Sequence, residues 1–385
     1  MDKRSVVKKK VLFLTGTRAD FGKLKPLMKS VDESSLLECS IFVTGMHTMA
    51  KYGYTVQEVL DANFQHIHVF MNQIDGEPMD LVLSNTVGGL SRFVHESKPD
   101  MIVVHGDRIE ALAGAIVGAL NNILVAHIEG GEVSGTIDGL IRHSVSKLSH
   151  LHYVANEEAK NRLLQMGESP DAVFIIGSPD IDIMLSEKLP TLDEVKIRYE
   201  INFQKYGIIL FHTVTTENDA IAKQANNLVS AAIKSNRDYI VIYPNNDAGN
   251  EYIFSAYERI RDNPKFRFFP SLRFEYFLTL LKHADFILGN SSSGIREAPV
   301  YAVPCINIGT RQQDRFTHEM IVNVNGDEEE ILNAIRGLGS ISTKQSSCYF
   351  GQGNSAQSFK TLLEEASVWN APKQKRFCDL HYQTK

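Results

Sequence analysis

The stretch MIVVHGDRIEALAGAIVGALNNILVAHIEGGE, residues 101–132, decides the fold. It opens with the apolar run Met101 to Val104, continues with helical spacing of apolar residues from Arg108 to Leu120, and ends in a second apolar run, Ile123 to His127. Two short apolar runs joined by a helical pattern are typical of parallel strands with a crossover helix. The stretch therefore predicts one βαβ unit of a parallel sheet.

The same alternation runs along the chain and predicts two α/β halves with a parallel sheet in each. The expected strands are Val11 to Thr15, Ile41 to Thr44, Met101 to Val104, Ile123 to His127 and Phe174 to Ile176, then Ile208 to Phe211, Tyr239 to Tyr243, Phe266 to Phe269, Phe286 to Leu288 and Cys305 to Ile308. A turn cluster places the boundary near residue 180, so we expect domains over 1–180 and 181–368. Residues 369–385 form either a tail or a helix packed back across the hinge.

The composition restricts the classes of protein. The chain of 385 residues is 43% hydrophobic and 22% charged, which is typical of soluble globular proteins, and its net charge of -6 provides no global positive field for nucleic acid. No run approaches the ~20 apolar residues of a membrane helix, and the first apolar run is too short for a signal peptide. The separated Cys39, Cys305, Cys348 and Cys378 indicate neither a zinc site nor a disulfide framework. We therefore expect a cytoplasmic protein with no membrane or nucleic-acid partner.

Polar residues follow the predicted strands directly. Gly16-Thr17-Arg18-Ala19-Asp20 comes after the first strand and opens a helix, so its backbone N–H groups and Arg18 are placed to meet an anion. The Gly-x-Gly-x-x-Gly spacing of a dinucleotide site is absent. The plain alternative is a helix start that Thr17 caps.

Three carboxylates follow strand or helix ends in the first half. Asp107 and Glu129 come after neighbouring strands, and Asp138 opens a later helix with Arg142 one turn on. Carboxylates that share a cleft push their pKa values apart, which provides candidates for separate acid and base roles. For each acid alone a helix cap or surface ion pair is favoured over catalysis; the three together favour catalysis. A metal site is disfavoured, because no ligand spacing completes the alternating residues His105, Asp107, His127 and Glu129.

The strongest local signal in the second half is LGNSSSGIRE, residues 288–297. A strand runs into small residues and then a helix, so N–H groups, hydroxyls and the positive helix end predict a phosphate cradle. Glu297 is placed for ribose hydroxyls, and Arg311 adds a guanidinium. The alternative is a capped helix with a surface arginine. Two other strand ends place His212, which is a ligand or a structural residue, and Asn245 at this edge. Residues 269–274 either offer backbone groups and an aromatic ring to a nucleobase or belong to the core.

In their order along the chain, these motifs resemble the hydrolysing UDP-N-acetylglucosamine 2-epimerases of sialic acid synthesis. The resemblance spans roughly residues 10 to 380, and residues 21–27, 72–79 and 374–377 resemble the bacterial capsule branch. It implies a glycosyltransferase-B-like fold of two Rossmann-like domains facing a central cleft, and a homodimer or dimer of dimers. It also implies conversion of UDP-GlcNAc and water to ManNAc and UDP, by anti elimination to 2-acetamidoglucal and then syn hydration, with no cofactor or metal.

Motif by motif, the resemblance implies roles for individual residues. The catalytic set is Asp107, Glu129, Asp138 and His212; either Glu129 or Asp107 removes the proton at C2, and Asp138 helps to deliver a proton or position water. The residues implied to bind UDP are Arg18, Ala19, Asp20, Arg108, His212, Asn245, Leu272, Phe274, Ser291, Ser292, Glu297 and Arg311. Two positions depart from the family pattern: Thr213 stands where proline is usual, and Gly139-Leu140 where small polar residues are usual.

Several alternatives share these motifs. The first is a sister epimerase that acts on UDP-N,N'-diacetylbacillosamine in legionaminic acid synthesis, and the second is the non-hydrolysing branch, which returns UDP-ManNAc. A glycosyltransferase of the same fold would need an acceptor, and the acid cluster argues against it. A silent nucleotide-sugar sensor would bind without turnover, which the three retained acids disfavour.

Overall fold

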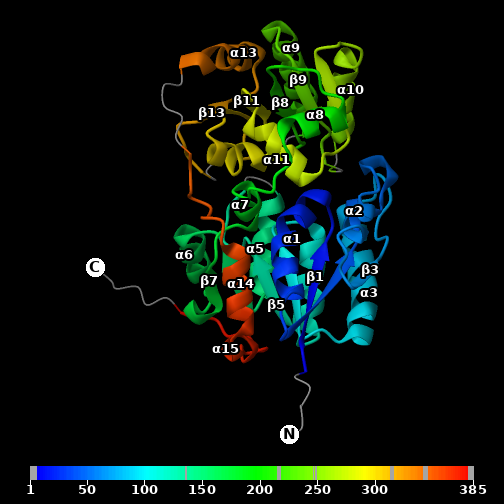
Figure 1. The fold of residues 1–385 in the computed structure, drawn as a ribbon, viewed down its shortest axis with the longest axis vertical. Helices are drawn as coiled ribbons and strands as arrows, with labels where there is room; N and C mark the ends of the chain where they lie inside the picture. Colours follow the sequence, from blue (N-terminus) through cyan, green and yellow to red (C-terminus); the bar gives the residue numbers. More distant parts are fainter. Residues whose placement is uncertain are drawn as a thin grey trace, which may run out of the picture. The chain divides into compact units, whose positions relative to one another are not determined.

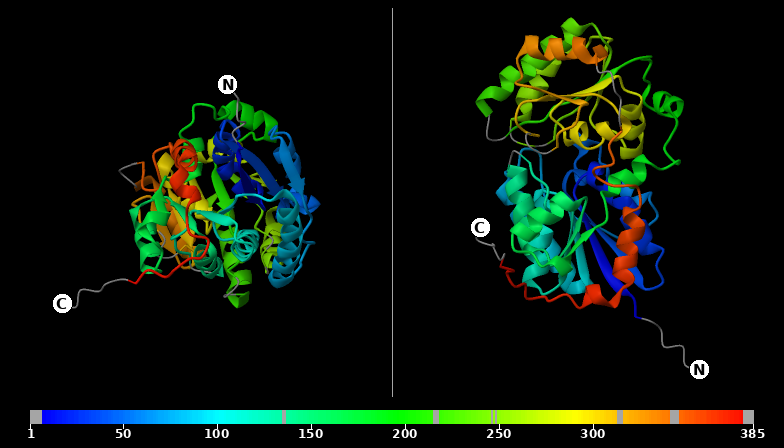
Figure 2. Two further views of the ribbon diagram at one scale, coloured as in Figure 1. Left: turned by 90° about the horizontal axis from the view of Figure 1, so that it is seen from below. Right: turned by 90° about the vertical axis from the view of Figure 1, so that its left-hand side faces the viewer.

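The computed structural model describes residues 7–134, 137–214, 218–245, 247, 249–312, 316–340 and 346–379. The chain divides into two compact units, and each is a parallel sheet covered by helices (Figures 1 and 2). The first unit comprises Met1–Glu132, Asp138–Leu185 and Tyr349–Lys385, and the second comprises Val133–Ile137 and Ser186–Cys348. Among the described helices, none is long and apolar enough to cross a membrane.

The first unit is built on a seven-stranded parallel sheet in the order β3-β2-β1-β4-β5-β6-β7. Its strands are β1 (Lys9–Thr15), β2 (Leu37–Val43), β3 (His66–Val69), β4 (Met101–His105), β5 (Leu124–Ile128), β6 (Leu151–Val154) and β7 (Val173–Ile175). Its helices are α1 (Arg18–Asp32), α2 (Val56–Leu60), α3 (Met79–Ser97), α4 (Ile109–Leu120), α5 (Ile137–Leu148), α6 (Glu157–Gln165), α7 (Pro179–Met184), α14 (Ser355–Glu364) and α15 (Ala366–Trp369).

The second unit is built on a six-stranded parallel sheet in the order β10-β9-β8-β11-β12-β13. Its strands are β8 (Gly207–Leu210), β9 (Tyr239–Ile242), β10 (Phe266–Phe269), β11 (Phe286–Gly289), β12 (Cys305–Ile308) and β13 (Ile321–Val324). Its helices are α8 (Leu192–Tyr199), α9 (Asn218–Ser235), α10 (Asn250–Tyr257), α11 (Phe274–Lys282), α12 (Ser292–Ile295) and α13 (Glu328–Gly337).

The decisive stretch forms the predicted βαβ unit in the middle of the first sheet. β4 and β5 pair in parallel from Met101 and Leu124, and α4 connects them. All strand residues except His105 are buried, as expected for a sheet covered on both faces. The expectation of two parallel-sheet α/β domains is therefore confirmed.

Three strands, β3, β6 and β13, were not predicted. β3 is an edge strand and β13 lies at the edge of the other sheet, so neither carries a continuous buried apolar run. β6 is fully buried, but its sequence LHYV interrupts the run with a histidine. A buried histidine needs a tertiary partner, and a sequence pattern does not reveal such a partner.

The end of the chain differs from the expected division. The second unit ends at Cys348 rather than at residue 368, and residues from Tyr349 onward return to the first unit. The physical reason is α14, whose Phe359 and Leu363 are fully buried in the core of the first sheet. Figure 1 shows this helix, in orange-red, beside α1, and Ser34 Oγ donates to the Glu364 carboxylate across 330 residues of sequence.

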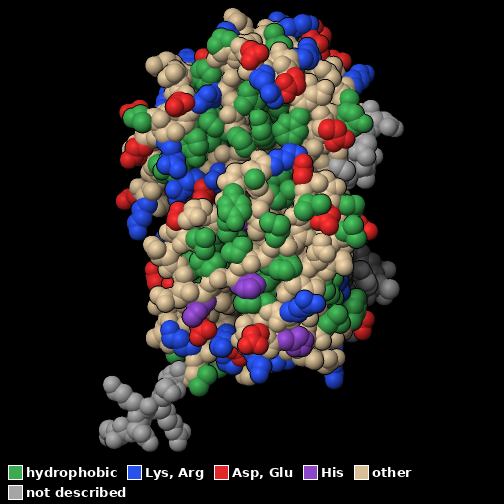
Figure 3. All heavy atoms as spheres, turned by 90° about the vertical axis from the view of Figure 1, so that its right-hand side faces the viewer, with side chains coloured by type: hydrophobic (Ala, Val, Ile, Leu, Met, Phe, Trp, Pro, Cys, Tyr) green, Lys and Arg blue, Asp and Glu red, His purple; other side chains and the backbone are tan. Residues whose placement is uncertain are grey.

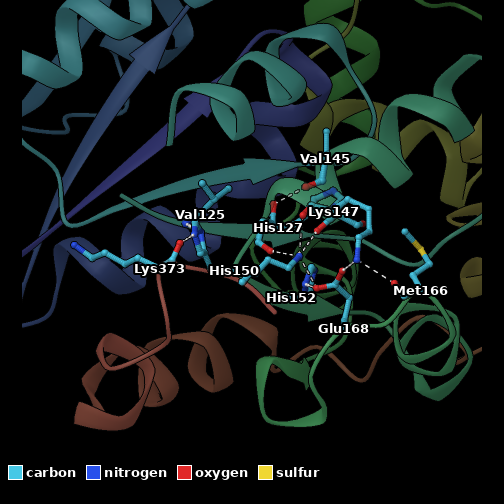
Figure 4. Close-up of polar contacts among 12 residues, drawn as sticks. Val125, His127, Val145, Lys147, His150, His152, Met166, Glu168 and Lys373 are labelled. Atoms are coloured by element: carbon cyan, nitrogen blue, oxygen red, sulfur yellow. Dashed lines mark hydrogen bonds and ion pairs between the residues drawn. The ribbon is translucent and has the colours of Figure 1, made fainter. Parts of the chain in front are cut away.

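A polar cluster around the buried Glu168 carboxylate binds the C-terminal segment through Lys375 (Figure 4). The carboxylate of Glu168, 1% exposed, contacts Lys147 at 2.8 Å, His152 at 2.9 Å and Lys375. Lys375 Nζ also donates to the backbone carbonyls of residues 146, 147 and 149, where α5 ends. A cation at a helix C-terminus is favourable, so the C-terminal segment stabilises the end of α5.

We predict that the protein loses stability below pH 6.5, because His47 and His127 are buried and neutral. Burial lowers the pKa of each to about 3. The unfolded chain then binds more protons than the folded chain between about pH 6.5 and pH 3, so stability falls as the pH falls through this window. Each histidine should cost about 2 kcal/mol between pH 6.5 and 5.

Urea unfolding at pH 7.5 and 5.0 measures this loss. His47→Gln is the matched control, because it removes one titrating group and should reduce the loss of stability by the share of that histidine, about 2 kcal/mol. Equal free energies of unfolding at the two pH values in the unmodified protein would contradict the prediction.

Candidate active site

Two predicted acids of the first unit leave the sheet next to each other. β4 and β5 are neighbours with His105 opposite Ile128, so Asp107 and Glu129 follow at the same edge. Arg142 of α5 connects them, because its guanidinium forms an ion pair with the Asp107 carboxylate and donates to the backbone carbonyl of Glu129 at 2.7 Å. The Arg142 side chain is only 2% exposed. One buried cation thus contacts both the Asp107 carboxylate and the Glu129 backbone.

Glu129 combines an unusual backbone with a firmly held side chain. Its φ of +63° lies in the left-handed region, which is uncommon for a residue with a side chain. Ser178 Oγ donates to its Oε1, and His105 Nε2 lies 3.2 Å from its Oε2. Strained backbone conformations cluster at functional sites. This geometry makes Glu129 the strongest candidate for chemistry in the first unit.

The turn after Glu129 requires glycine at its second position. Gly131 has a φ of +74°, and a Cβ atom there would lie 2.2 Å from the backbone oxygen of Ala159 in α6. No side-chain movement relieves a contact with backbone. The Gly130-Gly131 pair therefore lets the chain pass close to α6 directly after the strained residue.

Asp138 is the third predicted acid and lies in the first turn of α5, half-buried. It precedes Arg142 by four residues, so both side chains lie on the same face of the helix. A carboxylate is favourable at this position because of the helix dipole. α5 therefore carries a carboxylate and the connecting guanidinium toward the same part of the unit.

His127, one of the four residues weighed as metal ligands, is held by hydrogen bonds within the first unit. His127 uses both ring nitrogens, with Nε2 2.8 Å from the carbonyl oxygen of Gly106 and Nδ1 3.0 Å from the hydroxyl of Ser146. In the part of the chain that the structure describes, no three His, Cys, Asp or Glu side chains form a group that could hold a metal ion. His127 instead links the Gly106–Asp107 turn to α5.

The motif after β1 is arranged around a capping carboxylate. Asp20 accepts from Thr15 Oγ1 at 2.8 Å and from Gly16 N at 2.8 Å, and burial raises the pKa of its carboxyl. Arg18 forms an ion pair with Glu58 of α2, and Ala19 is exposed. The carboxylate of Asp20 thus orders the loop that presents Arg18.

Arg108 caps the start of α4 without a side-chain hydrogen bond to the helix. Its Nε lies 3.6 Å from the carboxylate of the buried Glu110. β1 and β4 pair directly, so Arg108 follows the strand next to the one that Arg18 follows. Both predicted arginines therefore occupy neighbouring strand ends of the first unit.

In the second unit, Asn290 joins two strand ends. Its side-chain oxygen accepts from His212 N at 2.7 Å, and its Nδ2 donates to the His212 carbonyl at 2.9 Å. His212 Nδ1 accepts from Asn245 N at 3.1 Å, so the neutral ring carries its proton on Nε2. The predicted residues His212 and Asn245 are thus brought together.

The small residues after β11 form the predicted loop. Ser291 caps the short α12, whose first residue is Ser292, and its hydroxyl accepts from Ser293 N at 3.3 Å. Arg311 and Gln312 both donate to the Asn290 carbonyl, at 3.2 Å and 3.0 Å. This hydrogen bond places the Arg311 guanidinium beside the loop, as the cradle requires.

The remaining predicted residues of this unit are buried. Glu297 is fully buried next to Arg296, one turn beyond the loop, and Leu272 and Phe274 are 7% and 5% exposed at the start of α11. These positions leave backbone groups rather than large exposed side chains for a ligand.

Sequence reasoning missed Ser178, Asn290 and Gln312 as site residues. Asn290 lay within the quoted loop, and the contact it makes to the His212 backbone was not visible from spacing. Ser178 lay in a turn that was interpreted only as a domain boundary, although its position directly after a strand was a usable signal.

Comparison with known proteins places this geometry in context. The family model described as UDP-N-acetylglucosamine 2-epimerase matches residues 29–364. The chain is 50% identical to a UDP-N-acetylglucosamine 2-epimerase of Neisseria meningitidis serogroup B over 376 residues, which are 97% of this chain and 100% of the relative. It is 35% identical to a UDP-N,N'-diacetylbacillosamine 2-epimerase of Legionella pneumophila, over 92% of this chain and 96% of the relative.

Among solved structures, the fold is similar to that of UDP-GlcNAc 2-epimerase from Neisseria meningitidis bound to UDP-GlcNAc. The TM-score is 0.79 at 19% identity, and the match covers 92% of this chain and all of that one. The Methanocaldococcus jannaschii UDP-GlcNAc 2-epimerase gives a TM-score of 0.78 at 21% identity, over 92% and 99% of the two chains. At these identities the similarity concerns the fold.

Proposed function

The chain belongs to the UDP-N-acetylglucosamine 2-epimerase family, and we propose that Asp107, Glu129 and Asp138 supply its proton transfers. The enzyme is a hydrolysing UDP-N-acetylglucosamine 2-epimerase, which converts UDP-GlcNAc and water to ManNAc and UDP. The observation that carries the assignment of residues is the left-handed Glu129, whose side chain accepts from Ser178 and whose backbone carbonyl shares the Arg142 guanidinium with the Asp107 carboxylate.

The first step is an anti elimination. A carboxylate removes the proton from C2 of the GlcNAc ring, the C2–H electrons form the C1=C2 bond, and the C1–O bond breaks to release UDP. The base must be ionised and fixed against a weakly acidic carbon. Glu129 fits this requirement through its two side-chain partners, and Asp107 is the second candidate.

The second step is a syn hydration of 2-acetamidoglucal. Water adds its hydroxyl to C1, and C2 receives a proton on the face opposite to the one that lost it. Inversion at C2 therefore needs acid groups on both faces of the ring, which supports separate roles for several carboxylates. We assign Asp138 to proton delivery or to positioning of the water.

The second unit provides groups for the departing diphosphate. The His212 Nε2–H, the serine loop and the Arg311 guanidinium can stabilise the charge that develops on UDP. Arg18 and Arg108 add cations from the first unit. UDP binding also involves the other predicted residues, Ala19, Asp20, Asn245, Leu272, Phe274, Ser292 and Glu297.

Proton NMR of the purified protein with UDP-GlcNAc in deuterated water tests this function. We expect free ManNAc with deuterium at C2, formed together with UDP. UDP-ManNAc would indicate the non-hydrolysing reaction. An unchanged spectrum would contradict UDP-GlcNAc as the substrate, and the same experiment with UDP-N,N'-diacetylbacillosamine would then follow.

We also propose that the enzyme is a homo-oligomer, either a dimer or a dimer of dimers. In the first unit, hydrophobic side chains gather on the side that carries α2, β3 and α3 (Figure 3). The exposed apolar residues of β3, of the segment after it and of the first turn of α3 are Val69, Met71, Ile74, Met79 and Leu81. Such a concentration is more typical of a covered surface than of a monomer.

Ile74→Glu should reduce the mass measured by light scattering to that of one chain, because a charge would be buried in the contact. Ile197→Glu is the matched control, since Ile197 is 80% exposed on α8 of the other unit. Its mass should remain that of the unmodified protein. A single-chain mass for the unmodified protein, or no change in Ile74→Glu, would contradict the proposal.

A cytoplasmic location is proposed as well. All four cysteines are unpaired. This is usual where thiols are kept reduced. Cell fractionation with immunodetection tests the location, and recovery outside the cytoplasmic fraction would contradict it.

A further inference from the structure

The turn between β7 and α7 contains a serine whose hydroxyl is used in an unusual way. Ser178 is the N-cap residue of α7, with Pro179 in the first helical position. An N-cap serine ordinarily accepts a hydrogen bond from its own helix, but Ser178 makes no such bond. Its hydroxyl donates instead to Oε1 of Glu129, 49 residues away in sequence. Helix α7 therefore has no side-chain cap from Ser178, and the Glu129 carboxylate has a hydrogen-bond donor instead.

The backbone of Ser178 is held from two sides. Its N–H donates to the Phe350 carbonyl at 2.7 Å, and its carbonyl accepts from Ile181 N at 3.0 Å. Gly177 lies so close to Gly351 that a Cβ atom on it would be 3.2 Å from the Gly351 Cα. The residue is 0% exposed. The returning segment that begins at Tyr349 therefore fixes the position of this hydroxyl.

The same returning segment also holds the rest of α7. The carboxylate of Asp182 accepts from the backbone N–H groups of Ser355 and Ala356, at 2.9 Å and 2.8 Å, where α14 begins. α7 is thus attached to the C-terminal part of the chain at its N-cap residue and again at Asp182. A rigidly supported partner is what a precisely oriented catalytic group requires.

The hydroxyl has a chemical consequence for Glu129. A hydrogen bond donated to a carboxylate favours its ionised form, and a general base must be ionised. With Ser178 on Oε1 and His105 on Oε2, both oxygens have neighbours that set the plane of the carboxylate. Other charged or titratable groups on the surrounding elements include Arg142 with its partner Asp107, His127 of β5, His152 and Tyr153 of β6, and, on α7, Asp182 and Asp180 with its partner Lys23.

We propose that Ser178 is a positioning residue for the epimerisation, whose hydroxyl orients the Glu129 carboxylate and keeps it ionised for removal of the C2 proton. The inference rests on the proposed role of Glu129 as base. It assigns the β7–α7 turn and the returning segment at Phe350 to the support of catalysis.

The test compares Ser178→Ala with Ser178→Thr. The alanine variant should lower kcat about 10- to 100-fold with KM for UDP-GlcNAc within about twofold, because the substrate contacts remain. The acid limb of its kcat profile should move up by about one pH unit, because the carboxylate has lost a donor. The threonine variant retains the hydroxyl and should restore both kcat and the pH profile.

Ser149→Ala is the matched control, because Ser149 is equally buried but its hydroxyl donates back to the Val145 carbonyl in the last turn of α5. Its kcat and pH profile should equal those of the unmodified enzyme. Unchanged kcat and pH profile in Ser178→Ala would overturn the inference, and so would the same displaced profile in Ser178→Thr. If the unmodified enzyme itself forms no C2-deuterated ManNAc, the proposed function fails, which is a separate result.

Discussion

Glu129→Gln is expected to lower kcat by about 1,000-fold while UDP affinity stays within about twofold. Glutamine has nearly the same shape, and its amide oxygen can still accept from Ser178, so the fold of the turn is retained. It has no ionised carboxylate with which to remove the C2 proton. Turnover by NMR and UDP binding by calorimetry measure the two quantities. Full activity in this variant would reject Glu129 as the base and leave Asp107 as the candidate.

Glu168→Gln is the control for loss of a buried carboxylate. Glu168 is also buried in the first unit, but its partners are Lys147, His152 and Lys375 rather than the predicted acids. We expect it to lose about 2 kcal/mol of unfolding free energy, because the partly exposed Lys147 and Lys375 lose their contacts with a buried carboxylate, with kcat within about fivefold. Glu129→Gln should show the opposite pattern. Equal losses of stability and activity in both variants would mean that the effect of Glu129 is structural.

The contrast between these two glutamates shows what a sequence pattern can predict. Asp107 and Glu129 were expected together because each directly follows a strand that its apolar residues identify, and adjacent parallel strands end at one edge. Glu168 follows no predicted strand. Its partner His152 lies in β6, which the histidine itself concealed from a hydrophobic pattern. Polar pairs of this kind depend on tertiary packing, and the spacing of residues along the chain does not predict them.

The residues that orient the site could likewise not be predicted from the sequence. Ser178 reaches Glu129 only because the Glu129 backbone is left-handed and because residues after Tyr349 return to the first unit. A left-handed glutamate is not expected from local preference, since glycine stands next to it at residue 130. The expected boundary at residue 368 assigned α14 to the wrong half, because an amphipathic helix fits any apolar face. The acids were therefore predictable, and what orients them was not.

The second large effect is expected at Gly289, the last residue of β11. Its φ is +143°, and a Cβ atom there would lie 2.1 Å from the Leu210 backbone oxygen and 2.6 Å from the Leu210 carbonyl carbon. Both atoms belong to β8, the paired strand, so neither can turn aside as a flexible side chain would. Gly289→Ala must therefore separate the two strand ends or change the backbone, at a cost of about 3 kcal/mol or more in the second unit.

The consequence reaches the proposed diphosphate site, because the next residue is Asn290. Its side chain holds the His212 backbone, and its carbonyl accepts from Arg311 and Gln312. A displaced strand end moves the histidine, the serine loop and the arginine together. We therefore expect UDP affinity to fall about 100-fold or more, since several charge-assisted contacts are lost at once.

Gly337→Ala is the matched control, because Gly337 ends α13 in the same unit and a Cβ atom there would have nothing within 4 Å. Its stability should change by about 0.5 kcal/mol at most, and its UDP affinity should not change. The chain's single tryptophan, Trp369, lies in the first unit, so its fluorescence reports that unit while circular dichroism reports both. Gly289→Ala should lower the melting temperature of the second unit, measured by circular dichroism, and leave the melting temperature measured by tryptophan fluorescence unchanged. Unmodified UDP affinity in Gly289→Ala would show that the strand end at β11 does not organise the site.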